Sequence, residues 1–330
     1  MEKQGFCKIL DAAETDFEGQ ALTVFRRQYA ENTVYRDYVN ALGVEPGLVR
    51  SLSAIPFLPI RFFKTHKVVT GVFEPQHIFE SSGTTGMVNS RHYIKDSGNY
   101  ETSFMRGFEK VYGSPDKYCV LGLLPSYLER GNASSLVFMV DALIRRSGQP
   151  DSGFYLKEDA KLAAVLEKLE KAGQPSLLIG VSFALLDFAE KHSIQLNHTR
   201  IIETGGMKGR REELIRAALH EKLQKAFGPA PIHAEYGMTE LLSQAWSTGE
   251  GLFSCPPWMK VLVREEEDPL RVMKQGSGAI NIIDLANQDS CAFIATDDAG
   301  RLHADGSFEV LGRMDGSDLR GCSLLVIDNG

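Results

Sequence analysis

The chain has 330 residues, enough to bury a large core and to form two or three subdomains. Its net charge of −7 argues against a nucleic-acid surface, and no apolar run is long enough to span a membrane. The 5 cysteines are scattered without a C-x-x-C pair, and the N-terminus does not resemble a signal peptide. A reducing cytoplasm therefore fits best, and a zinc site is not expected.

The N-terminal region is predicted to be helical over residues 14–42. Five apolar residues are available for its buried face: Phe17, Leu22, Phe25, Tyr29 and Tyr38. The next apolar run, residues 55–64, contains Pro56 and Pro59. Proline lacks an amide donor and disfavours helix in the residue before it, so this run is predicted to be extended and buried under the core.

A stretch rich in glycine and hydroxyl groups follows a short apolar run at 77–79, which is predicted to be a strand. It contains Ser81, Ser82, Gly83, Thr84, Thr85 and Gly86. Glycines let several backbone N–H groups point into one concavity, and hydroxyls add donors for an oxygen-rich ligand. The stretch has the composition of a phosphate-binding loop, although the common G-x-x-x-x-G-K-[ST] spacing is absent. Composition alone leaves a flexible surface loop as the alternative.

Beyond this loop, amphipathic helices alternate with buried apolar strands. Helices are predicted at 97–112, 134–146, 161–169, 184–191 and 211–227. Strands are predicted at 118–125, 176–181, 200–203 and 232–235. We expect a core face with Phe104, Phe108 and Val111 in the first helix, and with Leu214, Ile215, Ala218, Leu219 and Leu223 in the last. The alternation predicts an α/β fold with a parallel sheet built from right-handed crossovers.

From residue 252 onward the pattern changes to short strands separated by turns. Strands are predicted at 261–263, 279–283, 291–295 and 307–311, with turn signals at 298–300 and 305–306. We therefore divide the chain into an α/β core at 1–251, a small β subdomain at 252–314, and a short hinge and tail at 315–330.

Four segments resemble motifs of the adenylate-forming superfamily, and they occur in that superfamily's order. They are the loop at 81–86, Tyr236-Gly237-Met238-Thr239-Glu240, Thr296-Asp297-Asp298, and Gly312-Arg313-Met314-Asp315. The proline-containing run followed by Phe63-Lys64 is similar to the acyl-protein synthetase subunit of bacterial fatty acid reductase, as are the stretches 125–130 and 320–324. The resemblance implies the N-terminal-domain fold of adenylate-forming enzymes, with parallel α/β sheets and a small β subdomain.

The resemblance also implies ATP and Mg²⁺ as cofactors. Thr239 would bond the α-phosphate beside the loop, and Glu240 would hold Mg²⁺. The alternative for these two residues is a helix N-terminus, where both types are favourable. The superfamily's loop usually carries a lysine that is missing here, and Arg91 is a candidate replacement.

The resemblance also assigns residues to the binding of the adenine, the ribose and the acid. By the resemblance, the region of Gly205 and Gly206 lines the adenine and acyl pocket, and Tyr236 and Gly237 lie at adenine. Asp298 would accept hydrogen bonds from the ribose hydroxyls, although the neighbouring Asp297 is an alternative for this role. Arg313 would contact the ribose or a phosphate. The alternatives are a tight turn for the glycines, core packing for Tyr236, and a solvated surface for Asp298 and Arg313.

The first hypothesis is therefore an ATP-dependent acyl-protein synthetase, which converts a long-chain fatty acid to an acyl-adenylate and then to a protein thioester. Cys322 is the predicted acceptor, because it lies between glycine and serine, with Arg320 near enough to lower its pKa. It follows Arg313 by 9 residues, a span of about 30 Å when extended. A small buried side chain is the alternative for Cys322, and Cys255 or an external thiol is the alternative acceptor.

One departure from the superfamily bears on the mechanism. The superfamily carries a mobile C-terminal domain with a catalytic lysine after its hinge, whereas 15 residues follow Asp315 here. Arg313, Arg320 or a partner would have to replace that lysine. Two other functions stay open: a CoA ligase related to phenylacetate-CoA ligases, and a non-catalytic nucleotide-binding subunit. An acyl reductase or another acyl-acceptor protein is the expected partner.

Overall fold

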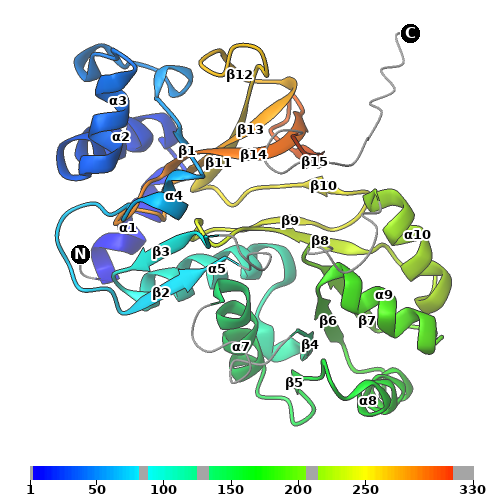
Figure 1. The fold of residues 1–330 in the computed structure, drawn as a ribbon. Coiled ribbons are helices and arrows are strands. Elements are labelled where there is room, and N and C mark those ends of the chain that lie inside the picture. Colours follow the sequence, from blue (N-terminus) through cyan, green and yellow to red (C-terminus); the bar gives the residue numbers. More distant parts are fainter. Residues whose placement is uncertain (1–2, 82–87, 125–133, 206–214, 315–330) are drawn as a thin grey trace, which may run out of the picture.

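The computed structural model describes residues 3–81, 88–124, 134–205 and 215–314. Several predicted site residues lie outside this part of the chain, namely Ser82, Gly83, Thr84, Thr85, Gly86, Gly206 and Cys322. The described residues form two large sheets and one hairpin, with helices on both faces of the parallel sheet (Figure 1). Among them, no helix is both long and apolar enough to cross a lipid bilayer.

The N-terminal region forms three helices, α1 (Lys3–Ala13), α2 (Phe17–Glu31) and α3 (Thr33–Ala41). The single helical stretch predicted for 14–42 is therefore wrong in one respect, because it is broken at Asn32. Asn32 has extended backbone angles, and its side chain accepts a 3.0 Å hydrogen bond from the amide of Tyr35. This is an N-cap, the position at which asparagine is favoured over continuing the helix.

The proline-containing run lies in the core, as predicted, over its first half. After the short 3-10 turns η1 (Pro46–Leu48) and η2 (Leu52–Ala54), strand β1 (Leu58–Pro59) pairs in parallel with a C-terminal strand, with Leu58 opposite Ile294. The extended prediction fails from Phe62, where α4 (Phe62–Thr65) begins. No proline follows Pro59 in this run, so nothing prevents one helical turn there.

The candidate phosphate loop joins the two strands of a separate hairpin. Strand β2 (His77–Glu80) pairs antiparallel with β3 (Arg91–Ile94), and Glu80 lies opposite Arg91. The predicted strand at 77–79 is thus confirmed, but it belongs to this hairpin and not to the parallel sheet. Phe79 anchors the hairpin, because its ring lies 5.4 Å from that of Tyr100 in α5 (Ser97–Tyr112).

The parallel sheet confirms the predicted α/β fold. Its strand order is β5-β4-β6-β7-β8-β9, and all neighbours are parallel except β8 and β9. The strands are β4 (Cys119–Leu123), β5 (Gly153–Phe154), β6 (Ser176–Gly180), β7 (Thr199–Glu203), β8 (His233–Tyr236) and β9 (Ala245–Ser247). The helices between them are α7 (Ser135–Ser147), α8 (Asp159–Ala172), α9 (Ser182–Lys191) and α10 (Arg216–Phe227), and η3 (Pro115–Lys117) precedes β4.

Alternate residues of these strands enter two different cores, as expected for strands that are buried on both faces. Leu121 and Leu178 pack in the cluster that contains the apolar faces of α8, α9 and α10. Val120 and Leu177 pack in the cluster that contains α5 and α7. Two predicted core positions are wrong: Val111 is 39% exposed and Ile215 is 74% exposed. Val111 lies on the outer side of α5, and Ile215 precedes the first turn of α10.

The C-terminal region forms a sheet in the order β10-β15-β14-β13-β11-β12. Its strands are β10 (Leu252–Phe253), β11 (Met259–Arg264), β12 (Val272–Met273), β13 (Gly276–Asp284), β14 (Phe293–Leu302) and β15 (Phe308–Arg313). The N-terminal strand β1 also pairs with β14, so this sheet includes residues from both ends of the chain.

The turn predicted at 298–300 is wrong, because β14 runs through it. The pairing of β14 with β15 shifts register between Ala299 and Gly300. A Cβ atom at Gly300 would lie 2.6 Å from the carbonyl oxygen of Glu309, so the glycine allows a close approach of two backbones. The predicted turn at 305–306 is confirmed, and Gly306 has a φ of +87°.

Candidate active site

Three predicted site residues from three different strands meet at the junction of the two sheets. Tyr236 is the last residue of β8, and its hydroxyl donates a 2.8 Å hydrogen bond to Oδ2 of Asp298 in β14. Nε of Arg313, at the end of β15, lies 3.8 Å from Oδ1 of the same carboxylate. The resemblance predicted all three as nucleotide-binding residues, and the fold brings them into one chain of contacts.

The Tyr236 ring is largely buried, with 8% of its surface exposed. It packs edge-on against Phe253 and Phe308, with ring centroids 5.9 and 5.6 Å away. Burial, followed by the charge of Asp298, raises the pKa of Tyr236 well above its usual value, so the hydroxyl stays protonated and donates. Core packing is therefore observed, and stacking on adenine stays a prediction.

The two neighbouring carboxylates of β14 contact different partners. Asp298 faces Tyr236 and Arg313, whereas Oδ1 of Asp297 lies 3.6 Å from Nη2 of Arg61. Successive side chains of a strand point to opposite sides, which explains the separation. Asp298 is therefore the carboxylate that lies with the other predicted nucleotide residues.

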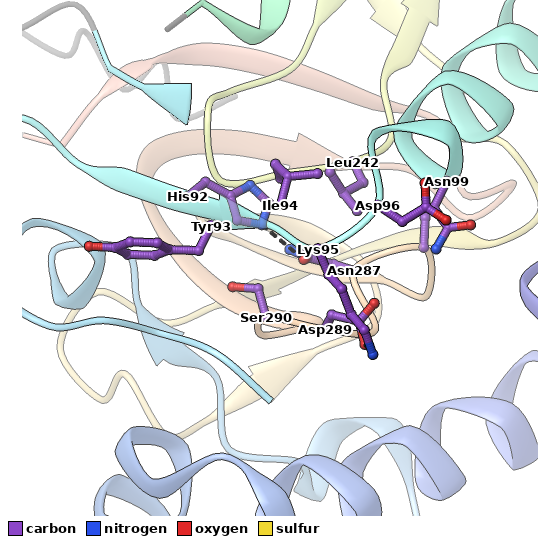
Figure 2. Close-up of a pocket in the computed structure, with 11 residues that line it drawn as sticks. His92, Tyr93, Ile94, Lys95, Asp96, Asn99, Leu242, Asn287, Asp289 and Ser290 are labelled. Atoms are coloured by element: carbon purple, nitrogen blue, oxygen red, sulfur yellow. Dashed lines mark hydrogen bonds and ion pairs between the residues drawn. The ribbon is translucent and has the colours of Figure 1, made fainter. Parts of the chain in front are cut away.

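Thr239 and Glu240 form a turn after β8, so the helix N-terminus considered as an alternative is not observed. Two side chains hold this turn by its carbonyl groups. His92 donates from Nδ1 to the oxygen of Thr239 at 2.8 Å, and Asn287 donates from Nδ2 to the oxygen of Glu240 at 2.8 Å. Nε2 of His92 lies 3.1 Å from Oδ1 of Asn287 (Figure 2).

Sequence reasoning did not single out His92. Burial lowers its pKa to about 4, so the ring is neutral near pH 7 and its Nδ1 proton is committed to Thr239. His92 lies in β3, and β3 follows the candidate phosphate loop. The loop's hairpin and the Thr239–Glu240 turn are therefore linked by one histidine. Arg91, the candidate loop cation, is instead paired with Glu80 at 3.1 Å.

The pocket beside His92 is too small for a nucleotide or an acid. Its volume is about 10 Å³, room for about one water molecule. His92, Asn287 and Asp289 line it together with Asn99, whose buried Oδ1 has no hydrogen-bond partner (Figure 2). This pocket is therefore not a site for substrate.

The end of β7 carries a second group that sequence reasoning missed, the carboxylate of Glu203. It accepts from the amide of Gly205 at 2.8 Å, from Oγ of Ser182 at 3.1 Å and from Nε of Arg216 at 2.8 Å. Burial acts to raise the pKa of Glu203, but three neighbours outweigh it and hold the pKa at about 2: His220, whose Nε2 lies 3.7 Å from Oε1, Arg216 and the amide of Gly205. Gly205 has a φ of +62°, a backbone conformation that favours glycine.

Arg216 extends this contact to the C-terminal sheet. Its Nη1 donates to the carbonyl oxygen of Val310 at 3.2 Å, and its guanidinium lies 4.9 Å from the Phe253 ring. A partly buried ion pair thus connects the end of β7 with β15, three residues before Arg313.

The donor set for a metal is limited in the described part of the chain. No group of three or more His, Cys, Asp or Glu side chains there could hold an ion. Mg²⁺ is often held by one or two carboxylates together with substrate phosphates, and metal binding by Glu240 stays a prediction.

A family model described as "Acyl-protein synthetase, LuxE" matches residues 6–329. The chain belongs to this LuxE family. The family assignment made from the four motifs and the proline-containing run is thereby confirmed. No curated protein matches the chain.

Solved structures similar to this LuxE-family chain are adenylate-forming enzymes. One is 2-hydroxyisobutyryl-CoA ligase in complex with 2-HIB-AMP and CoA, with a TM-score of 0.66, 15% identity, and coverage of 96% of this chain and 70% of that chain. Another is ATP-bound MatB from Rhodopseudomonas palustris, with a TM-score of 0.53, 16% identity, and coverage of 72% and 47%. The chain spans about half the length of the MatB structures it matches. At these identities the likeness shows the fold, which confirms the predicted fold class.

Proposed function

We propose that the protein uses ATP to convert a carboxylic acid to an acyl-adenylate and then transfers the acyl group to a protein cysteine as a thioester. The observation that carries this proposal is the contact of Tyr236, Asp298 and Arg313 at the junction of the two sheets. Membership of the LuxE family and the adenylate-forming fold support the same reaction. A long-chain fatty acid is the proposed substrate.

In the first half-reaction, a carboxylate oxygen attacks the α-phosphorus of ATP, and pyrophosphate leaves. The protein's part is to position the two groups and to neutralise charge. We assign ribose binding to Asp298 and Arg313, and α-phosphate binding to Thr239, whose carbonyl His92 holds in place. Mg²⁺, when bound at Glu240, would offset phosphate charge.

In the second half-reaction, a thiolate attacks the acyl carbonyl carbon, a thioester forms, and AMP leaves. Four cysteines lie in the described residues, and three of them suit this role poorly. Cys119 and Cys291 are buried, and burial raises the pKa of Cys255 to about 12, so little thiolate forms near pH 7. This supports Cys322 or an external thiol as the acceptor. An acyl reductase or another acyl-acceptor protein is the proposed partner.

The test is ATP–pyrophosphate exchange with purified protein and a panel of carboxylic acids of increasing chain length. Pyrophosphate exchange that depends on the acid supports adenylate formation. If no acid supports exchange, the remaining function is that of a non-catalytic nucleotide-binding subunit. Thr84→Val with Thr85→Val should lower exchange by at least about tenfold if the loop binds phosphate. Formation of acyl-CoA on addition of CoA, without acylated protein, would instead show a CoA ligase.

A further inference from the structure

Four buried polar side chains at the carboxyl end of the parallel sheet have polar atoms without hydrogen-bond partners. Three of these atoms are Oγ1 of Thr204, Oε1 of Gln244 and Nε1 of Trp246. The fourth group is the carboxyl of Glu235, whose residue is 9% exposed and whose oxygens, which are not fully enclosed, make no hydrogen bond or ion pair with the described residues. Buried polar groups in native proteins nearly always have partners, so four orphaned groups together need an explanation.

The strand register places these groups in one row. Glu203 pairs with Ala234, so the next residues, Thr204 and Glu235, are neighbours across β7 and β8. Glu235 pairs directly with Trp246 in β9. Residues opposite each other in a sheet share a face, and Gln244 shares it with Trp246 because they are two apart.

This row faces α5 and not the nucleotide residues. The Trp246 ring packs edge-on against Phe108 and Tyr112 of α5, with ring centroids 6.0 and 5.5 Å away. Tyr236, the next residue after Glu235, points to the other face, toward Asp298. The row and the nucleotide residues therefore lie on opposite sides of the same strand, one residue apart.

Glu235 and Gln244 meet above Gly237. A Cβ atom at residue 237 would lie 2.3 Å from Oε1 of Glu235 and 3.3 Å from Cγ of Gln244. A side chain at this position would therefore have to displace the Glu235 carboxyl from its observed place. Gly237 begins the segment that leads to Thr239, which connects the row to the proposed phosphate-binding turn.

The carboxyl of Glu235 is the group that a ligand must satisfy. Burial, followed by the negative charge of Glu203, raises the pKa of Glu235 to about 8, so the group is mostly protonated near pH 7. A neutral carboxyl donates one hydrogen bond and accepts others. Trp246 Nε1 can only donate and Gln244 Oε1 can only accept, so a matching ligand group must do both. A hydroxyl does both, whereas an alkyl chain does neither.

We propose that the row of Thr204, Glu235, Gln244 and Trp246 is a subsite for a hydroxyl group on the acyl chain, so that the preferred substrates are hydroxylated acids. This deepens the proposed function and rests on it. A plain alkanoic acid would leave the same buried groups unpartnered, and sites built to bond a substrate hydroxyl discriminate strongly against analogues that lack it. We therefore expect the row to discriminate between hydroxylated and plain acids when they bind, before the adenylation step.

The test measures binding in the absence of ATP. The chain has 2 tryptophans, so Trp258→Phe leaves Trp246 as the fluorescent reporter. Hydroxylated and plain acids of equal chain length, with the hydroxyl moved along the chain, are titrated against this protein. We expect at least one hydroxylated acid to bind at least about tenfold more tightly than its plain counterpart. Glu235→Leu should remove this preference while it keeps or improves binding of the plain acid.

Glu109→Leu on the exposed side of α5 is the matched control, and the preference should persist in it. If Glu235→Leu does not fold, Gln244→Leu serves in its place. Equal binding of hydroxylated and plain acids by the parent protein, or an unchanged preference in the folded row variants, overturns the proposal. Acid-dependent exchange without any preference would refute the subsite alone. A preference in binding without exchange on any acid would refute the enzymatic function alone.

Discussion

Tyr236 and Asp298 are joined by a 2.8 Å hydrogen bond that connects the parallel sheet with the C-terminal sheet. Tyr236 donates, because its hydroxyl is protonated, and the carboxylate accepts. Asp298 also lies 3.8 Å from Arg313, the last residue of β15. A ligand bound to Asp298 would therefore contact groups positioned by both sheets at once.

The first prediction separates the two neighbouring aspartates of β14. Asp298→Asn keeps the side-chain shape and removes the charge that Tyr236 and Arg313 contact. The KM for ATP in pyrophosphate exchange should rise about tenfold, the usual cost of a lost hydrogen bond to a charged group. Asp297→Asn, which removes only the contact with Arg61, should change this KM by less than about twofold. Equal effects of the two substitutions would contradict the assignment.

The second prediction concerns the metal. Glu240→Gln preserves size and loses charge, so the Mg²⁺ concentration for half-maximal exchange should rise by about tenfold and the maximal rate should fall. Glu80→Gln, at an exposed carboxylate paired with Arg91, is the control and should keep the wild-type Mg²⁺ dependence. A wild-type Mg²⁺ dependence in Glu240→Gln would show that this residue is structural.

The third prediction concerns the acyl acceptor. After incubation with ATP, Mg²⁺ and a radiolabelled acid, the denatured protein should carry label that hydroxylamine removes. Cys322→Ser should lose this label and keep pyrophosphate exchange, because adenylation precedes transfer. Cys255→Ser should keep the label, since burial raises the pKa of the Cys255 thiol to about 12. Label retained in Cys322→Ser would exclude this cysteine.

The fourth prediction is a pH dependence of stability caused by Glu235. The folded protein holds this proton up to a pKa of about 8, whereas the unfolded chain releases it near its ordinary pKa of 4.5. Between these values the folded state binds more protons, so its contribution to stability falls as pH rises, by up to about 1.4 kcal/mol per pH unit. Above pH 8 the contribution is constant.

Glu235→Gln should remove this slope. The difference in free energy of unfolding between variant and wild type, measured with urea from pH 5 to pH 9, should grow in favour of the variant up to about pH 8. Glu109→Gln on the exposed side of α5 should show no such trend. A difference that does not change with pH would mean that Glu235 is ionised in the folded protein.

The sequence predicted the parallel sheet well because its strands are buried on both faces. Continuous apolar runs such as 119–123 and 176–180 are typical of strands with both faces covered. The amphipathic helices between them indicate the helical crossovers that join parallel strands. The sequence also named Tyr236, Asp298 and Arg313 as motif residues, and the fold brings these three together. That these three side chains lie together depends on how the two sheets pack, which cannot be predicted from a local sequence pattern.

The errors share a physical cause, which is that distant contacts override local preference. Asp298 and Gly300 favour a turn, but pairing with β13 and β15 on both sides keeps β14 extended through them. His92 and Glu235 gave no signal, because their importance comes from burial beside residues far along the chain.

The pairing of β1 with β14 has a consequence for biosynthesis. Gln28 and Asn32 are fully buried, and their partners are backbone groups of Asn287, Ala292 and Ser290. A ribosome makes the N-terminal helices before these partners, so the two amides lack them until the chain has been made beyond residue 292. The growing chain therefore exposes part of its apolar core until these residues are made. Pairing of β1 with β14 is a late folding step, because it depends on contacts between residues far apart in the sequence.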